Sequence, residues 1–249
     1  MNKKYISLVV VALLLSACGG SSSSSKNDGK GSIDLVEYLP SKSMTKTFSS
    51  VERDGDDVDT SHYEELIEVK GNTITTTVNS KLEEKIVFSD TNITTTSFDE
   101  DGNDIDNSFR YVDLGDTLLS KKITFSENND LGKISTDLDF TCKLKSKESK
   151  FEKNDHIYTG DLLKIECIGD GEIVYDIKQT LLDAGVASDL NGSHSIYNTS
   201  YVYLKKGIGE VASINDDCVT NEKLPKVVND KAKSTECVKK KYEYEFYLP

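Results

Sequence analysis

Two acidic stretches of this sequence contain the residue types from which a calcium site could be built. Calcium takes six to eight oxygen ligands, and alternating acidic residues on a turn can supply several of them. One candidate is the acidic stretch 54–59. A second candidate combines five oxygen-bearing side chains: Asp99, Asp101, Asn103, Asp104 and Asp106.

Neither stretch follows the EF-hand pattern, in which glycine is the sixth residue and glutamate the twelfth. Counted from Asp99, Gly102 is the fourth residue and Arg110 the twelfth. Asp-Gly and Gly-Asn pairs favour the positive φ angles of tight hairpin turns. We therefore interpret both stretches as hairpin turns and keep the second as a calcium candidate behind that interpretation.

Catalytic motifs are scarce. The sequence has neither a Gly-x-Ser-x-Gly nor a His-Glu-x-x-His motif. Ser43 and Lys46 match Ser-x-x-Lys, but the companion motifs Ser-Asp-Asn and Lys-Thr-Gly are absent. His62, His156 and His194 stand in unrelated polar contexts, and we predict that they are surface residues. We therefore expect neither an enzyme nor a bound cofactor.

The N-terminus has the three parts of an export signal. Lys3 and Lys4 precede an apolar run over residues 6–15, which is too short to span a membrane. Small residues then lead to Cys18 in the sequence Leu15-Ser16-Ala17-Cys18. This segment resembles the lipobox of bacterial lipoproteins. The resemblance implies that residues 1–17 are a signal peptide, that Cys18 becomes the lipidated N-terminus, and that this lipid anchors the protein to a membrane.

A flexible linker is predicted to follow the lipidated cysteine over residues 18–32. Its residues are mainly Gly and Ser without apolar side chains, so they cannot form a core. A linker of this length has a root-mean-square reach of about 20 Å. Residue 19 is Gly rather than the Asp that favours inner-membrane retention in Gram-negative bacteria. By that resemblance we expect the outer membrane of the cell envelope.

The four remaining cysteines indicate two disulfide bonds, as an even number does in an exported protein. Of the three possible connectivities we choose the pairs nearest in sequence, Cys142–Cys167 and Cys218–Cys237. The absence of any C-x-x-C motif argues against zinc.

The charge of the chain is strongly acidic, with a formal net charge of −13. Loss of Lys3 and Lys4 with the signal peptide leaves 28 basic and 43 acidic residues, a net charge of −15. This excess argues against nucleic acid as a partner, because binding to its phosphates requires Lys and Arg. Anionic lipids are repelled as well, so the lipid on Cys18 must hold the membrane.

Residues 33–249 are predicted to form a single β-rich domain, because short alternating runs separated by turn residues dominate them. The fold class we expect is all-β and mainly antiparallel: a twisted meander, half-barrel or sandwich. One ambiguous helical stretch covers residues 177–187. The expected strands cover residues 62–69, 73–78, 82–88, 91–98, 109–112, 118–125, 138–144, 161–168, 172–178, 197–204, 208–214 and 242–248.

The last strand shows the clearest alternation. Tyr242, Tyr244, Phe246 and Leu248 are predicted to face the main core, and the residues between them, which include two glutamates, are predicted to face water.

Two segments resemble uncharacterised β-rich envelope lipoproteins. Residues 201–211 are similar to their strand–Gly-x-Gly–strand segments, and residues 97–103 are similar to their hairpin turns. We interpret Gly207 and Gly209 as a bulge or tight bend.

The function we expect is a non-enzymatic binding or structural role, with an envelope protein or an apolar ligand as the partner. The alternatives are a carrier or chaperone with a curved-sheet cavity for an apolar ligand and, last, an envelope enzyme. A dry cavity of several hundred Å³ would favour the carrier. A solid core would favour an interaction module, and polar groups with perturbed acidities in a cleft would favour the enzyme.

Overall fold

A computed structural model describes residues 32–54, 57–98, 103–128, 132–185, 191–220 and 237–249. These residues form strands almost throughout. The helical elements are a 3-10 turn, η1 (Leu35–Tyr38), and a short helix, α2 (Gln179–Asp183). The strands are β1 (Ile33–Asp34), β2 (Met44–Asp54), β3 (Asp57–Lys70), β4 (Thr73–Val78), β5 (Lys81–Phe88), β6 (Asn92–Phe98), β7 (Asn103–Phe109), β8 (Tyr111–Val112), β9 (Thr117–Asn128), β10 (Gly132–Lys153), β11 (His156–Ile177), β12 (Gly192–Lys205), β13 (Gly209–Thr220) and β14 (Cys237–Leu248).

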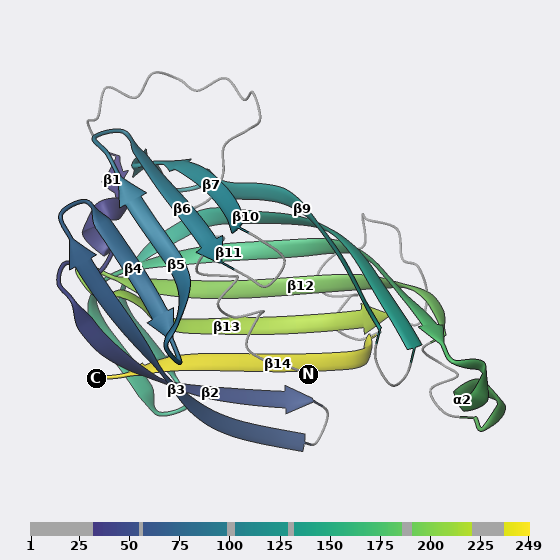
Figure 1. The fold of residues 1–249 in the computed structure, drawn as a ribbon. Helices are drawn as coiled ribbons and strands as arrows, with labels where there is room; N and C mark the ends of the chain where they lie inside the picture. The colour runs from purple at the N-terminus through teal and green to yellow at the C-terminus, as the bar shows by residue number, and fades with distance from the viewer. Residues whose placement is uncertain (1–31, 55–56, 99–102, 129–131, 186–190, 221–236) are drawn as a thin grey trace.

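Twelve strands make one antiparallel sheet in the order β7-β6-β5-β4-β3-β2-β14-β13-β12-β11-β10-β9. Neighbours in the sheet are neighbours along the chain, with one exception. The C-terminal strand β14 lies between β2 and β13 and joins the two halves. In Figure 1 the long strands β9–β14 form a floor, and β3–β7 fold over one end of it. This strongly curved sheet confirms the expected all-β, mainly antiparallel class, and of the architectures expected it is the half-barrel. No helix among the described residues is long and apolar enough to cross a membrane.

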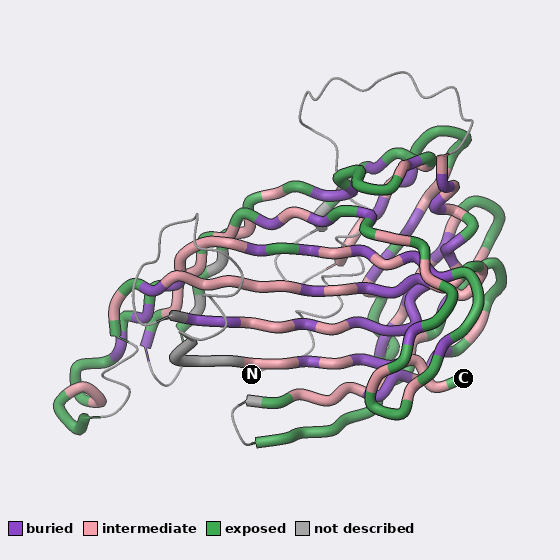
Figure 2. Tube along the Cα trace, turned by 180° about the vertical axis from the view of Figure 1, so that it is seen from behind, coloured by how far each residue is buried: buried purple, intermediate pink, exposed green. Residues whose placement is uncertain are grey.

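Alternation of buried and exposed residues builds the sheet, as in β4, where Ile74, Thr76 and Val78 are buried and the threonines between them are half-buried. Figure 2 shows buried positions gathered where the two halves of the sheet face each other, whereas residues 57–62 of β3 are exposed. The concave face here carries the largest apolar cluster, which includes residues of both halves. Leu35, Tyr38 and Leu39 add to it from the N-terminal segment.

The sheet also has an aromatic cluster on its other face. The hairpin between β10 and β11 lies against this face, where the ring of Phe151 is 4.2 Å from that of Tyr203, and His156 stacks on Phe246 at 4.2 Å. The strand register shifts between Leu144 and Ser146 and between Glu148 and Lys150, ahead of this hairpin. Such bulges bend a strand.

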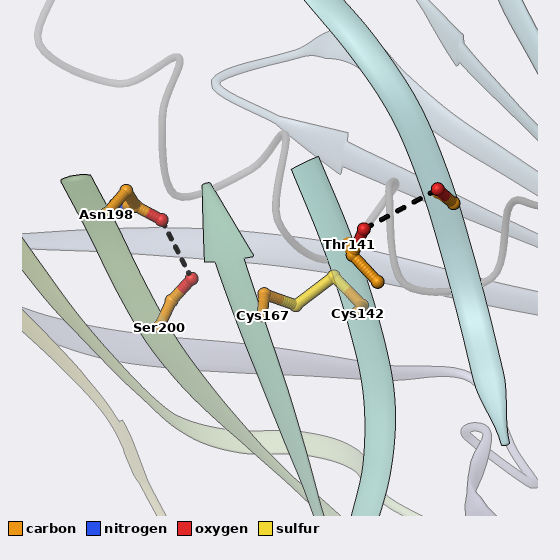
Figure 3. The surroundings of a disulfide bond; sticks show 6 residues. Thr141, Cys142, Cys167, Asn198 and Ser200 are labelled. Carbon is orange, nitrogen blue, oxygen red and sulfur yellow. Dashed lines mark hydrogen bonds between the residues drawn. A yellow bond between two sulfur atoms is a disulfide. The ribbon is translucent and has the colours of Figure 1, made fainter. Parts of the chain in front are cut away.

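The predicted Cys142–Cys167 disulfide is present. The two cysteines lie directly opposite each other on β10 and β11, with their Cα atoms 4.0 Å apart (Figure 3). Cys218 is also in a disulfide. The side chain of Cys237 lies outside the described residues, and the Cys218–Cys237 bond stays a prediction.

Three details of the sequence-based expectation need correction. The predicted strands 161–168 and 172–178 are one strand, β11, which passes through Gly171, where an added Cβ would overlap the carbonyl oxygen of Asp137. Strand β2 was not predicted. The Gly207–Gly209 bend is confirmed, with φ angles of +73° and +83°.

The third correction concerns β14, which pairs on both sides as a buried strand would. Its predicted faces are wrong. Glu243 and Glu245 are buried on the concave face, with 7% and 5% of their surface exposed, whereas Tyr242 and Tyr244 are half-buried on the opposite face. Phe246 is fully buried, but in the aromatic cluster rather than the main one. Both faces of this central strand are covered, so polarity alone does not distinguish inside from outside.

Candidate functional site

Five charged side chains gather on the concave face; four of them are buried and Glu65 is half-buried. Lys46 on β2 lies opposite Glu65 on β3, and Glu84 on β5 lies opposite Thr76 on β4. Thr76 in turn lies opposite Ile67, which is on the same face as Glu65 because residues two apart share a face. Glu210 on β13 and Glu245 on β14 complete the group. We call these five residues, Lys46, Glu65, Glu84, Glu210 and Glu245, the interior charge cluster.

Lys46 is the only cation of this cluster, and 2% of its surface is exposed. Its Nζ donates to the carbonyl oxygen of Glu210 at 2.8 Å and lies 5.7 Å and 5.6 Å from the ring centres of Phe48 and Tyr247. Burial lowers the pKa of Lys46, while Glu65 and Glu210 oppose that shift. The position is therefore shaped for an ammonium group, through a carbonyl and two aromatic faces.

Gly209 has no side chain, and this absence makes room for the Lys46 ammonium group. It has a positive φ of +83°, and a Cβ added here would lie 3.0 Å from Cδ of Pro40 and 3.4 Å from Nζ of Lys46. Any larger residue would strain the backbone and press on both neighbours.

Desolvation raises the pKa of each glutamate in the cluster. The pKa of Glu84 rises to about 8, through burial first and the charge of Glu65 second. The pKa of Glu210 also rises to about 8, through burial and Glu65, although Lys46 lowers it. Burial raises the pKa values of Glu65 and Glu245 as well. Glu84 and Glu210 therefore favour holding protons near neutral pH, and the pKa values of Glu65 and Glu245 shift in the same direction.

A cavity of about 50 Å³ lies within the cluster. Lys46, Glu65, Thr76, Glu84 and Glu210 line its polar side. Its apolar side is formed by Tyr38, Leu39, Pro40, Ile67, Ile74, Ile86 and Leu204. A site of this volume holds a few water molecules or one small ligand, since one water needs roughly 10–15 Å³ measured in this way.

Two carboxylate oxygens at the cavity are unsatisfied. Within the described part of the chain, Oε1 of Glu84 and Oε2 of Glu210 are buried without a hydrogen-bond partner. Both residues are more than nine-tenths buried, at 5% and 6% exposure. A buried polar atom left unpaired costs about 1–3 kcal/mol, so native proteins rarely leave one without a partner.

The N-terminal segment closes one side of the cavity. Its residues Tyr38, Leu39 and Pro40 form part of the apolar wall. The turn between β12 and β13 holds this segment in place, because Ser41 N donates to Gly207 O at 3.0 Å and Gly207 N donates to Glu37 O at 2.8 Å.

The residues singled out by sequence lie elsewhere. Asp99 and Asp101 fall outside the described residues, and so do the side chains of Asn103, Asp104 and Asp106 on β7. The calcium candidate stays untested by their geometry. Among the described residues no group of three His, Cys, Asp or Glu is placed to hold a metal ion.

The Ser-x-x-Lys match does not form a dyad. Ser43 is exposed, and its hydroxyl accepts from the backbone N–H of Val69, whereas Lys46 is buried on the other face.

The prediction that all three histidines are surface residues was partly wrong. His62 is exposed and His156 half-buried, but His194 is buried at 3% exposure, with its ring edge-on to Tyr175.

No family model and no curated protein sequence matches the chain. Among solved structures, a LolA superfamily protein from Nitrosomonas europaea is 10% identical, with 87% of this chain and 88% of that chain covered and a TM-score of 0.23. The NanC porin is 8% identical, with 82% and 100% covered and a TM-score of 0.23. Neither likeness indicates a function for this chain.

Replacing Lys46 by methionine tests whether its charge holds the cluster together. Methionine keeps most of the volume but removes the cation, which leaves the carboxyl groups without a counter-ion. Removing one partner of a buried pair typically costs 3–5 kcal/mol. We expect a loss of about this size at pH 9 and a smaller one at pH 5, where Glu84 and Glu210, with pKa values of about 8, are protonated. Urea unfolding at the two pH values measures it, with exposed Lys85→Met as the control; equal losses at both values would contradict the assignment.

Proposed function

We propose that the protein is a lipid-anchored envelope lipoprotein with a non-enzymatic binding role. Cys18 provides the anchor to the cell envelope, and the cavity in the curved sheet binds a small cation. The ligand class is ammonium or a short primary alkylammonium. The observation that carries this proposal is the pair of buried, unpartnered carboxylate oxygens of Glu84 and Glu210 at one small cavity.

The charge balance favours a cation. The cavity is lined by three glutamates, Glu65, Glu84 and Glu210, and by one lysine. Two ligand N–H groups would satisfy the free oxygens as charge-assisted hydrogen bonds, which are stronger than neutral ones. The opposite wall, with Ile74, Ile86 and Leu204, suits a short alkyl group.

The volume argues against the carrier for a large apolar ligand. Sites for drug-sized molecules measure about 300–1,000 Å³, whereas this cavity measures about 50 Å³. Lipid binding would therefore require the sheet or the N-terminal segment to move. Catalysis is disfavoured because the Lys46 amine already donates to a backbone carbonyl and packs on two rings.

Calorimetric titration of the full chain with methylammonium tests the proposal. We expect affinity to rise between pH 6 and pH 9 and a proton to be released on binding, because the pKa values of Glu84 and Glu210 are about 8 and the bound cation requires the ionised forms. Glu84→Gln should weaken binding at pH 9 by about 10- to 100-fold, as loss of a hydrogen bond to a charged group costs roughly 1.5–3 kcal/mol.

Glu64→Gln is the matched control, because this neighbour of Glu65 is exposed on the opposite face. Its affinity for methylammonium should equal that of the unaltered protein. The proposal fails if the folded protein binds no methylammonium at pH 9, or if Glu84→Gln and Glu64→Gln bind it equally well.

A further inference from the structure

Exposed apolar side chains cluster in one stretch of the chain. Ten large hydrophobic residues are exposed among the described residues, and four of them lie between residues 105 and 114. These are Ile105, Phe109, Tyr111 and Leu114, with 61%, 53%, 42% and 55% of their surface exposed. We call them the apolar patch. Scattered exposed apolar residues are normal, but a local group of them is typical of a binding surface.

The fold turns this patch outward. Strand β7 is an edge strand of the sheet, and its residues Ile105 and Phe109 share the outer face while Ser108 between them is buried. On β8, Tyr111 is exposed and Val112 is buried. Leu114 follows in the turn before β9. The four exposed side chains of the patch therefore lie on the edge strand β7, on β8 and in the turn before β9, within ten residues of the chain.

The predicted lipid tether joins the fold next to this patch. Ile33 of β1 pairs with Val112 of β8, and the adjacent Asp34 pairs with Tyr111. The Asp34 carboxylate accepts from Arg110 at 2.9 Å and 2.6 Å, and Leu35 N donates to Arg110 O at 2.9 Å. The start of the domain is thus fixed to residues 110–112, in the middle of the patch.

We propose that the apolar patch contacts the membrane in which the lipid on Cys18 is embedded. This inference depends on the proposed lipid anchor. Cys18 precedes Ile33 by 15 residues, and the linker predicted there from sequence has an expected reach of about 20 Å. The tether therefore keeps the patch within a short distance of the bilayer, which raises the effective concentration of the two surfaces.

The chemistry of the patch favours the interface of a zwitterionic bilayer. Tyr and Phe side chains suit the boundary between head groups and acyl chains. Asp113 and Asp116 flank Leu114 and disfavour anionic head groups. The patch has no strip of basic residues of the kind that binds acidic lipids.

Tryptophan fluorescence tests the contact directly, because the chain has no tryptophan. The full lipidated protein carrying Phe109→Trp is reconstituted into phosphatidylcholine vesicles, with and without brominated acyl chains. We expect a blue-shifted emission and at least a twofold quenching by the brominated lipid. Leu114→Trp is a second reporter, should the first variant unfold.

Ile157→Trp is the control. Ile157 is equally exposed, at 55%, but it lies beside His156, which stacks on Phe246 of β14. Ile157 itself is on β11, and β14, which packs against its hairpin, is six places from β7 in the sheet order. Brominated lipid should leave the emission of this variant unchanged.

Flotation of the same vesicles separates the two claims. If the protein floats with the vesicles and the Phe109→Trp and Ile157→Trp variants are equally unquenched, the anchor stands and the membrane contact is wrong. If the protein carrying native Cys18 behaves like Cys18→Ser and does not float, the anchor is wrong, and the contact falls with it. Flotation together with quenching of the Phe109→Trp variant alone supports the contact.

Discussion

Removal of residues 241–249 is expected to abolish cooperative folding of the domain. These residues include every position of β14 that pairs with β2, from Lys241–Asp54 to Leu248–Thr47, and six of those that pair with β13. Without them the sheet separates into β2–β7 and β9–β13, and the buried Phe246 is lost. Phe246 alone contributes about 1.5–3 kcal/mol by burial, against a typical stability of 5–15 kcal/mol. Thermal unfolding followed by circular dichroism should show no sigmoidal transition.

Two milder variants show whether the strand itself is responsible. Deletion of Pro249 alone removes an exposed residue after the last pair and should leave the melting temperature unchanged. Phe246→Ala should lower the free energy of unfolding by about 3–5 kcal/mol while the protein still folds. A protein lacking 241–249 that melts like the full chain would show that β14 is peripheral.

The fold class followed from local patterns that the structure preserves. Strand β4 was predicted with its observed bounds because Ile74, Thr76 and Val78 alternate without interruption between two turns. Strand β2 was not predicted because a lysine is normally expected to face solvent, whereas Lys46 is buried on the inner face of this strand. The order of the strands did not follow from sequence, since placing β14 between β2 and β13 requires contacts between the two ends of the domain.

The interior charge cluster could not be predicted from the sequence either, because it also depends on contacts between distant parts of the chain. With 43 acidic residues, no single glutamate stands out. Lys46, Glu84 and Glu210 come from strands that only the curvature of the sheet brings together. One signal was present. Glu243 and Glu245 alternate with aromatic residues in the C-terminal strand, and a central strand with both faces covered covers the glutamates as well as the aromatic residues.

The second large effect is a stability that falls as pH rises from about 4.5 to 8. The pKa of Glu84 and that of Glu210 are near 4.5 when unfolded and about 8 in the folded protein. A carboxyl group whose folded pKa is raised favours folding while it is protonated. Its contribution is complete below the unfolded pKa and is lost as pH rises through the folded pKa. One pKa unit corresponds to 1.36 kcal/mol, so each group accounts for up to roughly 5 kcal/mol.

Glutamine substitution isolates this effect from the rest of the chain. Glu84→Gln and Glu210→Gln mimic the protonated acids, so the double variant should match the unaltered protein at pH 5 and exceed its stability by several kcal/mol at pH 8. The groups facing this pair, Lys46 on β2, Glu65 on β3 and Glu245 on β14, keep their side chains in the variant, although Lys46 and Glu245 lose the charge of Glu210 that raises their pKa values. Urea unfolding at half-unit steps from pH 5 to pH 9 measures the difference, with exposed Glu64→Gln as the control.

Parallel pH profiles for the double variant and the control would mean that Glu84 and Glu210 are ionised in the folded protein across this range. The cavity would then already hold a full negative charge at neutral pH, and cation binding there would proceed without release of a proton.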